Sequence, residues 1–156
     1  MFKLRYNLLL FFCIGLAFTL KATHNRAGEI TYKWKYGYTY EIKVTTYTNV
    51  GGNNLADRCE DTVYFGDGTR AIVLRSNGPC NGGCSPGCEG VILPGGTIKI
   101  NEYVTTHGYD GPGNYLISME DPNRNAGVIN IPNSVDQVFY IESYLVIPTY
   151  GTRINN

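Results

Sequence analysis

Apolar and polar residues alternate along most of the chain after its first two dozen residues. Residues 29–36 are apolar or aromatic at every even position, with polar or charged residues between them. Residues 38–48 repeat this period of two, with Ile42 and Val44 on the apolar side. The alternation predicts two half-buried antiparallel strands, and Gly37 between them predicts a tight hairpin.

Five further segments have the composition of strands, namely residues 62–65, 70–75, 97–105, 114–120 and 137–147. Glycine-rich turns at 66–68 and 111–113 separate neighbouring segments. Residues 137–147 are apolar on both faces, which predicts a central place in a sheet. No helix is predicted after the N-terminal segment. Seven or eight short strands with Gly and Pro turns predict an all-β fold, an antiparallel sandwich of immunoglobulin-like type.

The N-terminal segment has the layout of a secretory signal peptide. Lys3 and Arg5 precede an uncharged apolar run at 8–20, which is too short for an ordinary membrane span. An uncleaved anchor is the alternative. We expect a signal peptide at 1–22 and one domain at 23–156, located outside the cell or at its surface. No later stretch is apolar enough to span a membrane.

Charge argues against one class of partner. The whole chain has 13 Lys and Arg against 13 Asp and Glu. Three basic residues and no acid leave with the signal peptide, so that ten basic residues against thirteen acidic ones give a net charge of −3. Because no basic excess remains, nucleic acid is not expected as a partner.

Four cysteines follow the signal peptide: Cys59, Cys80, Cys84 and Cys88. In an exported protein an even number of cysteines predicts disulfides, here two, and the sequence leaves three pairings open. Zinc is the alternative, although the loop has no histidine to complete a ligand set. Residues 76–96 form a long loop without strand pattern, which we expect the disulfides to staple.

Two segments resemble, in order, the signatures of PKD-type (polycystic kidney disease-like) β-sandwich domains: YFGDGT at 64–69 and THGYDGPGNYLI at 106–117. The resemblance implies a PKD/immunoglobulin-like sandwich into which the cysteine loop is inserted. The residues expected to be architectural in it are Gly66, Asp67, Gly68, His107, Tyr109, Gly113 and Tyr115. The Asp67 carboxylate is expected to cap backbone N–H groups, and His107 to bridge backbone groups at a strand end.

A wider resemblance covers nearly the whole exported chain. AGEITY at 27–32, ADRCE at 56–60 and DPNRNAG at 121–127 are similar to the N-terminal module of large Bacteroidetes surface proteins with gliding-motility-associated C-terminal domains. Further modules follow in that family, ending in a sorting domain read by the type IX secretion system. The chain is therefore expected to be either a piece of such a protein or a short free-standing relative. The implied partners are other modules of the same protein, a cell-surface protein or a glycan.

Catalytic patterns are weak. His24 and His107 are the histidines of the exported chain, and no serine lies in a GxSxG turn. Asp110, Glu120 and Asp121 are the candidates for the pair of acids that sugar hydrolysis requires. We favour turn caps and solvated side chains, and expect no catalytic residue and no enzyme.

Two further groups have a structural and a binding interpretation. The acids near loops are Asp57, Glu60, Asp61 and Asp67. We favour turn stabilisation for them and expect no cofactor, with weak structural calcium as the alternative. The tyrosines of the first hairpin are Tyr32, Tyr36, Tyr38 and Tyr40. In the interpretation that we favour, their rings pack in the core and on the faces of the sheet. In the alternative, they form a binding platform.

The sequence therefore favours a non-enzymatic extracellular module, structural or adhesive, of a bacterial cell-surface protein associated with gliding motility. The alternative function is a secreted carbohydrate-binding module, assisted by calcium.

Overall fold

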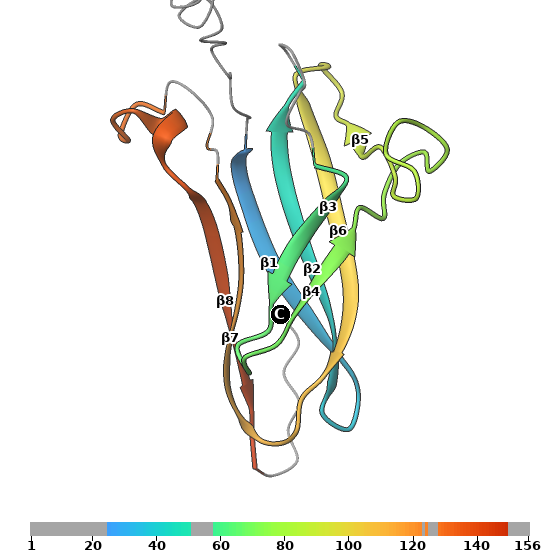
Figure 1. Cartoon of the computed structure of the whole chain (residues 1–156), viewed down its shortest axis with the longest axis vertical. Coiled ribbons are helices and arrows are strands. Elements are labelled where there is room, and N and C mark those ends of the chain that lie inside the picture. Colours follow the sequence, from blue (N-terminus) through green and yellow to red (C-terminus); the bar gives the residue numbers. More distant parts are fainter. Residues whose placement is uncertain (1–24, 51–57, 123, 125–127, 150–156) are drawn as a thin grey trace, which may run out of the picture.

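The computed structural model describes residues 25–50, 58–122, 124 and 128–149 (Figure 1). The expected signal peptide lies outside these residues. The strands are β1 (Asn25–Tyr36), β2 (Thr39–Asn49), β3 (Glu60–Tyr64), β4 (Arg70–Leu74), β5 (Val91–Ile92), β6 (Ile98–Gly108), β7 (Gly113–Asp121) and β8 (Phe139–Ile147). One short 3-10 turn, η1 (Ser134–Asp136), precedes β8. Within this part of the chain, no helix is long and apolar enough to cross a membrane.

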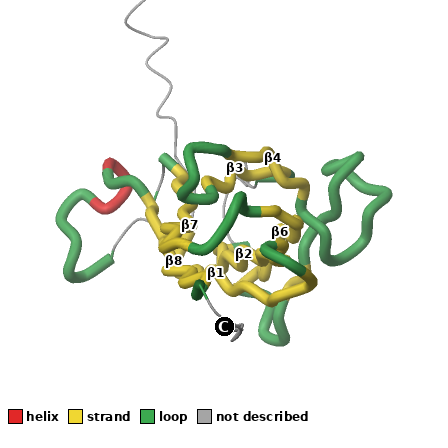
Figure 2. The backbone as a smooth tube through the Cα atoms, turned by 90° about the horizontal axis from the view of Figure 1, so that it is seen from below, coloured by secondary structure: helices red, strands yellow, loops and turns green. Residues whose placement is uncertain are grey.

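The strands form two sheets of four. The first sheet has the order β1-β2-β6-β5 and the second has the order β4-β3-β7-β8, and every strand pair is antiparallel. Seen nearly along the strands, the sheets enclose a common interior, with β8 beside β1 at one seam (Figure 2). An isolated bridge between Arg75 and Tyr103 joins β4 to β6 at the other seam. The predicted all-β antiparallel class is confirmed, and the arrangement is sandwich-like.

The predicted alternation accounts for the interior. Ile42 and Val44 of β2 are fully buried, and they pack with side chains of the second sheet such as Val63, Ile117 and Leu145. Full burial of a side chain of this size contributes about 1.5–3 kcal/mol. Since both sheets supply such residues to one cluster, their packing holds the two layers together.

The first hairpin forms where the sequence predicts it. Gly37 has a φ of 50° in the turn, and the last register pair before it joins Tyr36 to Thr39. The buried stripe of β1 ends before this turn, because Trp34 and Tyr36 are exposed. Of the even positions between 30 and 36 that the sequence predicts to be apolar, only Ile30 and Tyr32 are therefore interior residues.

The prediction that residues 137–147 form a central strand is wrong, because β8 lies at the edge of the second sheet. Its apolar residues on the outer face, Tyr140, Tyr144 and Val146, are exposed rather than covered. The Tyr32 hydroxyl of β1 donates a hydrogen bond to the Tyr144 carbonyl over 2.9 Å. A side-chain hydroxyl thus bonds to the backbone of the edge strand β8, which has no further strand beside it in the second sheet.

Two disulfides fasten the cysteine loop, as predicted: Cys59, just before β3, is joined to Cys84, and Cys80 is joined to Cys88. The loop also contributes β5, which pairs with β6 at Val91 and Ile92. Residues 76–96 are therefore fastened by covalent bonds and by a short ladder.

We predict that the disulfides stabilise the fold unequally. Cys59–Cys84 spans 25 residues and Cys80–Cys88 spans 8, and the longer span restricts the unfolded chain more. Replacing both cysteines by alanine should lower the free energy of unfolding by about 3–4 kcal/mol for the first pair and about 2–3 kcal/mol for the second. Urea unfolding without reductant measures both losses. Equal losses, or a larger loss for the short pair, would contradict this expectation.

Candidate functional site

The turn after β3 brings several of the sequence-predicted residues together. Asp67 accepts hydrogen bonds from the Thr69 N–H over 2.9 Å and from the Thr69 hydroxyl over 2.6 Å. Its second oxygen lies 2.7 Å from His107 Nε2 of β6. Asp67 caps a backbone N–H as expected, whereas the polar partner of His107 is this carboxylate and not the expected backbone groups. The contact ties the second sheet to the first.

Aromatic rings enclose His107. The ring stacks on Phe65 with centroids 3.9 Å apart, and Tyr109 meets it edge-on at 4.7 Å. The Tyr109 hydroxyl donates to the Phe65 carbonyl over 3.2 Å, and burial raises the pKa of Tyr109. Tyr115 lies against Tyr109 and donates to the Gly111 carbonyl over 3.0 Å. The cluster thus fixes the turn through side chains from β6, from β7 and from the connecting segments that follow β3 and β6.

The glycines of this turn differ in what surrounds them. Gly66 and Gly68 have φ angles of 81° and 88°, which favour glycine. A Cβ on Gly66 would meet the backbone of Leu116, whereas a Cβ on Gly68 would have nothing within 4 Å. Gly113, the third glycine of the motif, is the first residue of β7. Gly66 is thus required by the close approach of β7, and Gly68 by its backbone angle alone.

Hydrogen bonds set the pKa of the Asp67 carboxylate. Burial raises the pKa of Asp67, but the hydrogen bonds from Thr69 and His107 outweigh it and lower the pKa to about 2. The Thr69 hydroxyl also bonds to this carboxylate. Around the His107 ring lie the Asp67 carboxylate and the rings of Phe65 and Tyr109.

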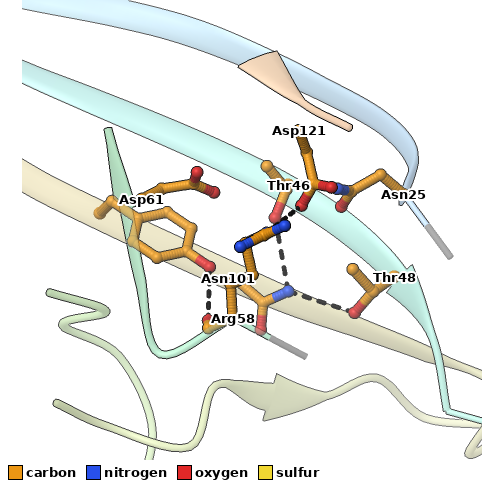
Figure 3. Close-up of a pocket in the computed structure, with 8 residues that line it drawn as sticks. Asn25, Thr46, Thr48, Arg58, Asp61, Asn101 and Asp121 are labelled. Carbon is orange, nitrogen blue, oxygen red and sulfur yellow. Dashed lines mark hydrogen bonds and ion pairs between the residues drawn. The ribbon is translucent and has the colours of Figure 1, made fainter. Parts of the chain in front are cut away.

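A second polar cluster lies between the sheets at the other end of β3 (Figure 3). Arg58 Nε lies 2.7 Å from Asp121 Oδ2, and the Tyr103 hydroxyl donates to the Arg58 carbonyl over 2.8 Å. Asn101 Nδ2 donates to the Thr48 hydroxyl over 3.1 Å. The cavity among these groups has a volume of about 10 Å³, which is room for a single water molecule. It is too small for an organic ligand.

Arg75 connects this region to the cysteine loop. Its side chain is 1% exposed and donates to Asn101 Oδ1 over 2.5 Å. It also donates to the Cys88 carbonyl over 2.6 Å and to Cys84 Sγ over 2.7 Å. One guanidinium therefore contacts β6 and a cysteine of each disulfide.

The sequence analysis did not single out Arg58, Arg75 or Asn101. For two of them a signal was available, because Arg75 continues the inward series of Ala71 and Val73 along β4. Asn101 stands two residues before the buried Tyr103 in the same way. A polar residue at an inward position of a strand marks a buried hydrogen-bonding centre.

The acids proposed for calcium do not converge. Asp61 and Asp67 lie at opposite ends of β3, and the Glu60 side chain is on the outer face. Asp57 lies outside the described residues. Among the residues that the structure describes, no three His, Cys, Asp or Glu side chains are grouped as metal ligands would be.

The acids weighed for sugar hydrolysis are also separated. Asp121 is buried and paired with Arg58, while Glu120 points to the outer face of β7. Asp110 lies in the turn before the opposite end of β7. His24 lies outside the described residues.

The hairpin tyrosines pave the interior instead of forming a platform. Tyr32 and Tyr40 are buried and meet edge-to-face with centroids 6.1 Å apart. Tyr38 packs partly buried against the same core, and Tyr36 is exposed. The structural interpretation is confirmed for Tyr32, Tyr38 and Tyr40, and the platform interpretation is wrong for them.

Comparison with known protein families, with curated proteins and with solved structures gave no match. The resemblance to PKD-type domains therefore enters below as a proposal.

We predict that Gly66→Ala destabilises the fold more than the matched variant Gly68→Ala. Both changes place alanine in a left-handed backbone conformation, at a cost of about 1–2 kcal/mol. Only Gly66→Ala adds a clash with β7, which should cost about 1–3 kcal/mol more. Chemical unfolding of the two variants measures the difference, and equal stabilities would show that β7 does not require this glycine.

We also predict a specific pH dependence from Asp61. Burial, together with the nearby charge of Asp121, raises the pKa of Asp61 from 3.8 to about 7. The folded state therefore favours protonated Asp61, so its contribution to stability is complete below about pH 4 and is lost as the pH rises towards 7. Asp67, whose pKa is lowered, acts in the separate range below its ordinary value of 3.8.

Asp61→Asn should flatten the decline in unfolding free energy between about pH 4 and pH 7, because the amide stays neutral throughout. Urea unfolding over a pH series tests this, with Asp110→Asn as an exposed control. If the Asp61→Asn and wild-type profiles run parallel, Asp61 does not titrate in this range.

Proposed function

We propose that this chain is a non-enzymatic extracellular module, structural or adhesive, of a bacterial cell-surface protein. The observation that carries the proposal is the fastening of the cysteine loop: two disulfides meet a buried Arg75 inside the fold. Disulfides of this kind persist in oxidising compartments. They support export, together with the signal-peptide pattern of the sequence.

The finer identity that we propose is a PKD/immunoglobulin-like sandwich. Its support is that Asp67, His107, Tyr109 and Tyr115, which carry the resemblance, belong to one connected cluster. A role in a gliding-associated Bacteroidetes protein exported by type IX secretion rests on the segments at 27–32, 56–60 and 121–127.

Support for a role without catalysis comes from how the polar side chains are used. Asp67 and His107 bond to each other, and Arg58 bonds to Asp121. The cavity beside the second pair admits about one water molecule. Such groups stabilise the fold and leave the outer surface of the sheets for contacts with other molecules.

We predict that the chain is exported from the cytoplasm with both disulfides formed. An epitope-tagged chain expressed in a Bacteroidetes host should be recovered from the periplasmic or extracellular fraction, and its mass after thiol alkylation should show no free cysteine at 59, 80, 84 and 88. The matched variant Leu16→Arg, which interrupts the apolar run, should remain inside and reduced. A wild-type chain that stays inside the cell with alkylated thiols would overturn the proposal.

A further inference from the structure

The outer faces of the two sheets differ in chemistry. Oppositely charged residues pair across strands on the first sheet. Lys35 Nζ lies 2.9 Å from Glu41 Oε2, and Lys43 Nζ lies 3.2 Å from Glu102 Oε1. Pairs of this kind are typical of a solvated face and give little reason for another protein to bind there.

The outer face of the second sheet is apolar and aromatic at many positions. In all four of its strands the odd residues point inward and the even residues outward. The large apolar and aromatic side chains that are half-buried or exposed on this outer face are Tyr64, Ile72, Leu74, Leu116, Tyr140, Tyr144 and Val146. Ile72 is 68% exposed and Tyr144 is 62% exposed. Exposed apolar residues that cluster on one face, unlike single scattered ones, are typical of an interaction surface.

We call this surface the tyrosine face. Leu116 and Tyr144 are register partners on neighbouring strands, so the apolar groups on β7 and β8 adjoin. The Tyr140 hydroxyl donates to Glu142 Oε2 over 2.8 Å, which orients the ring and the carboxylate together. Oriented tyrosines provide a large contact area with little loss of side-chain freedom on binding.

The tyrosine face is also acidic. Glu60, Glu120 and Glu142 point outward from β3, β7 and β8, against the single outward cation Arg70 of β4. The Arg70 guanidinium lies over the Tyr64 ring, 5.9 Å from its centroid. Three carboxylates against one guanidinium favour a partner that brings positive charge.

An open groove on the tyrosine face can accommodate the positive charge of such a partner. The β3–β7 ladder consists of Val63 with Met119 and Tyr64 with Ser118, and it stops before Glu60 and Asp121. Where the ladder stops, a groove opens that is lined by Glu60, Asp61, Thr62, Ile72, Glu120 and Pro122. Arg58 also lines it, but Asp121 holds that guanidinium. A lysine or arginine could lay its stem on Ile72 and its charge between Glu60 and Glu120.

We propose that the tyrosine face is a docking surface for another protein whose contact segment carries lysine or arginine between apolar residues. A second copy of this chain fits the charge less well, because a symmetric contact would set three carboxylates against three carboxylates. Exposed aliphatic residues such as Ile72 and Leu74 suit a protein partner better than a glycan, whose hydroxyl groups they cannot bond. The inference rests on the proposed role as a surface module and names its partner by chemistry.

The test uses the purified, disulfide-bonded chain as bait for a displayed library of random linear peptides. We expect the enriched peptides to combine basic and apolar residues. Their affinity should fall about tenfold or more in Tyr144→Ser. It should fall about threefold to tenfold in Glu120→Gln, with a weaker dependence on salt. Matched controls are Tyr36→Ser, which alters an exposed tyrosine of the hairpin, and Glu29→Gln on the first sheet; both should bind like the wild type. Unchanged unfolding midpoints show that all four variants are folded.

Several results would overturn the inference. They are the absence of enriched peptides, enrichment of peptides without basic residues, or binding that survives Tyr144→Ser. Sedimentation that shows a dimer lost in Tyr144→Ser would assign the face to a second copy. Glycan-array binding lost in the same variant would assign it to a carbohydrate. A chain that is exported but selects no such peptide loses this inference alone, whereas a chain that is not exported loses the proposed function.

Discussion

The buried guanidinium of Arg75 is the constraint on which one half of the molecule depends. An ionised group inside a protein costs several kcal/mol unless hydrogen bonds replace its water. Here Asn101 of β6 provides one such bond, and the Cys88 carbonyl and the Cys84 sulfur of the cysteine loop provide two others. The loop must therefore fold back onto the sheets for Arg75 to be solvated by the protein. The disulfides then keep these acceptors in place.

Polar ties between the sheets recur at both ends, with the apolar core between them. At one end Asp67 of the second sheet's turn meets His107 of β6, and at the other Arg75 meets Asn101. Apolar packing alone fixes the distance between the two sheets but only weakly resists sliding of one sheet over the other, because the hydrophobic effect is not directional. Hydrogen bonds at both ends are directional and set the register of one sheet on the other.

The sequence predicted what is local and missed what is long-range. Alternation located β2 and its buried residues correctly, and the glycines located the turns. The alternation could not place β8, because a strand that is apolar on both faces has the same sequence pattern whether its outer face is covered or exposed. The number of cysteines predicted two disulfides but not their pairing. The contacts of Arg75 with the cysteine loop and with β6, which accompany the observed pairing, exist only in the folded structure. The Asp67 turn was predicted from its motif, whereas its histidine partner, 40 residues away, was not.

The placement of β1 and β8 has a mechanical consequence. These outermost strands carry the two ends of the described fold, and β1 begins at the end of the molecule opposite to the one where β8 finishes (Figure 1). Tension between those ends acts along the strands, so the β1–β2 and β7–β8 ladders are loaded in shear and their hydrogen bonds share the force. Peeling would instead break the bonds one at a time. The cysteine loop is fastened to β6 and to Arg75, off this line of force, so extension does not load its disulfides directly.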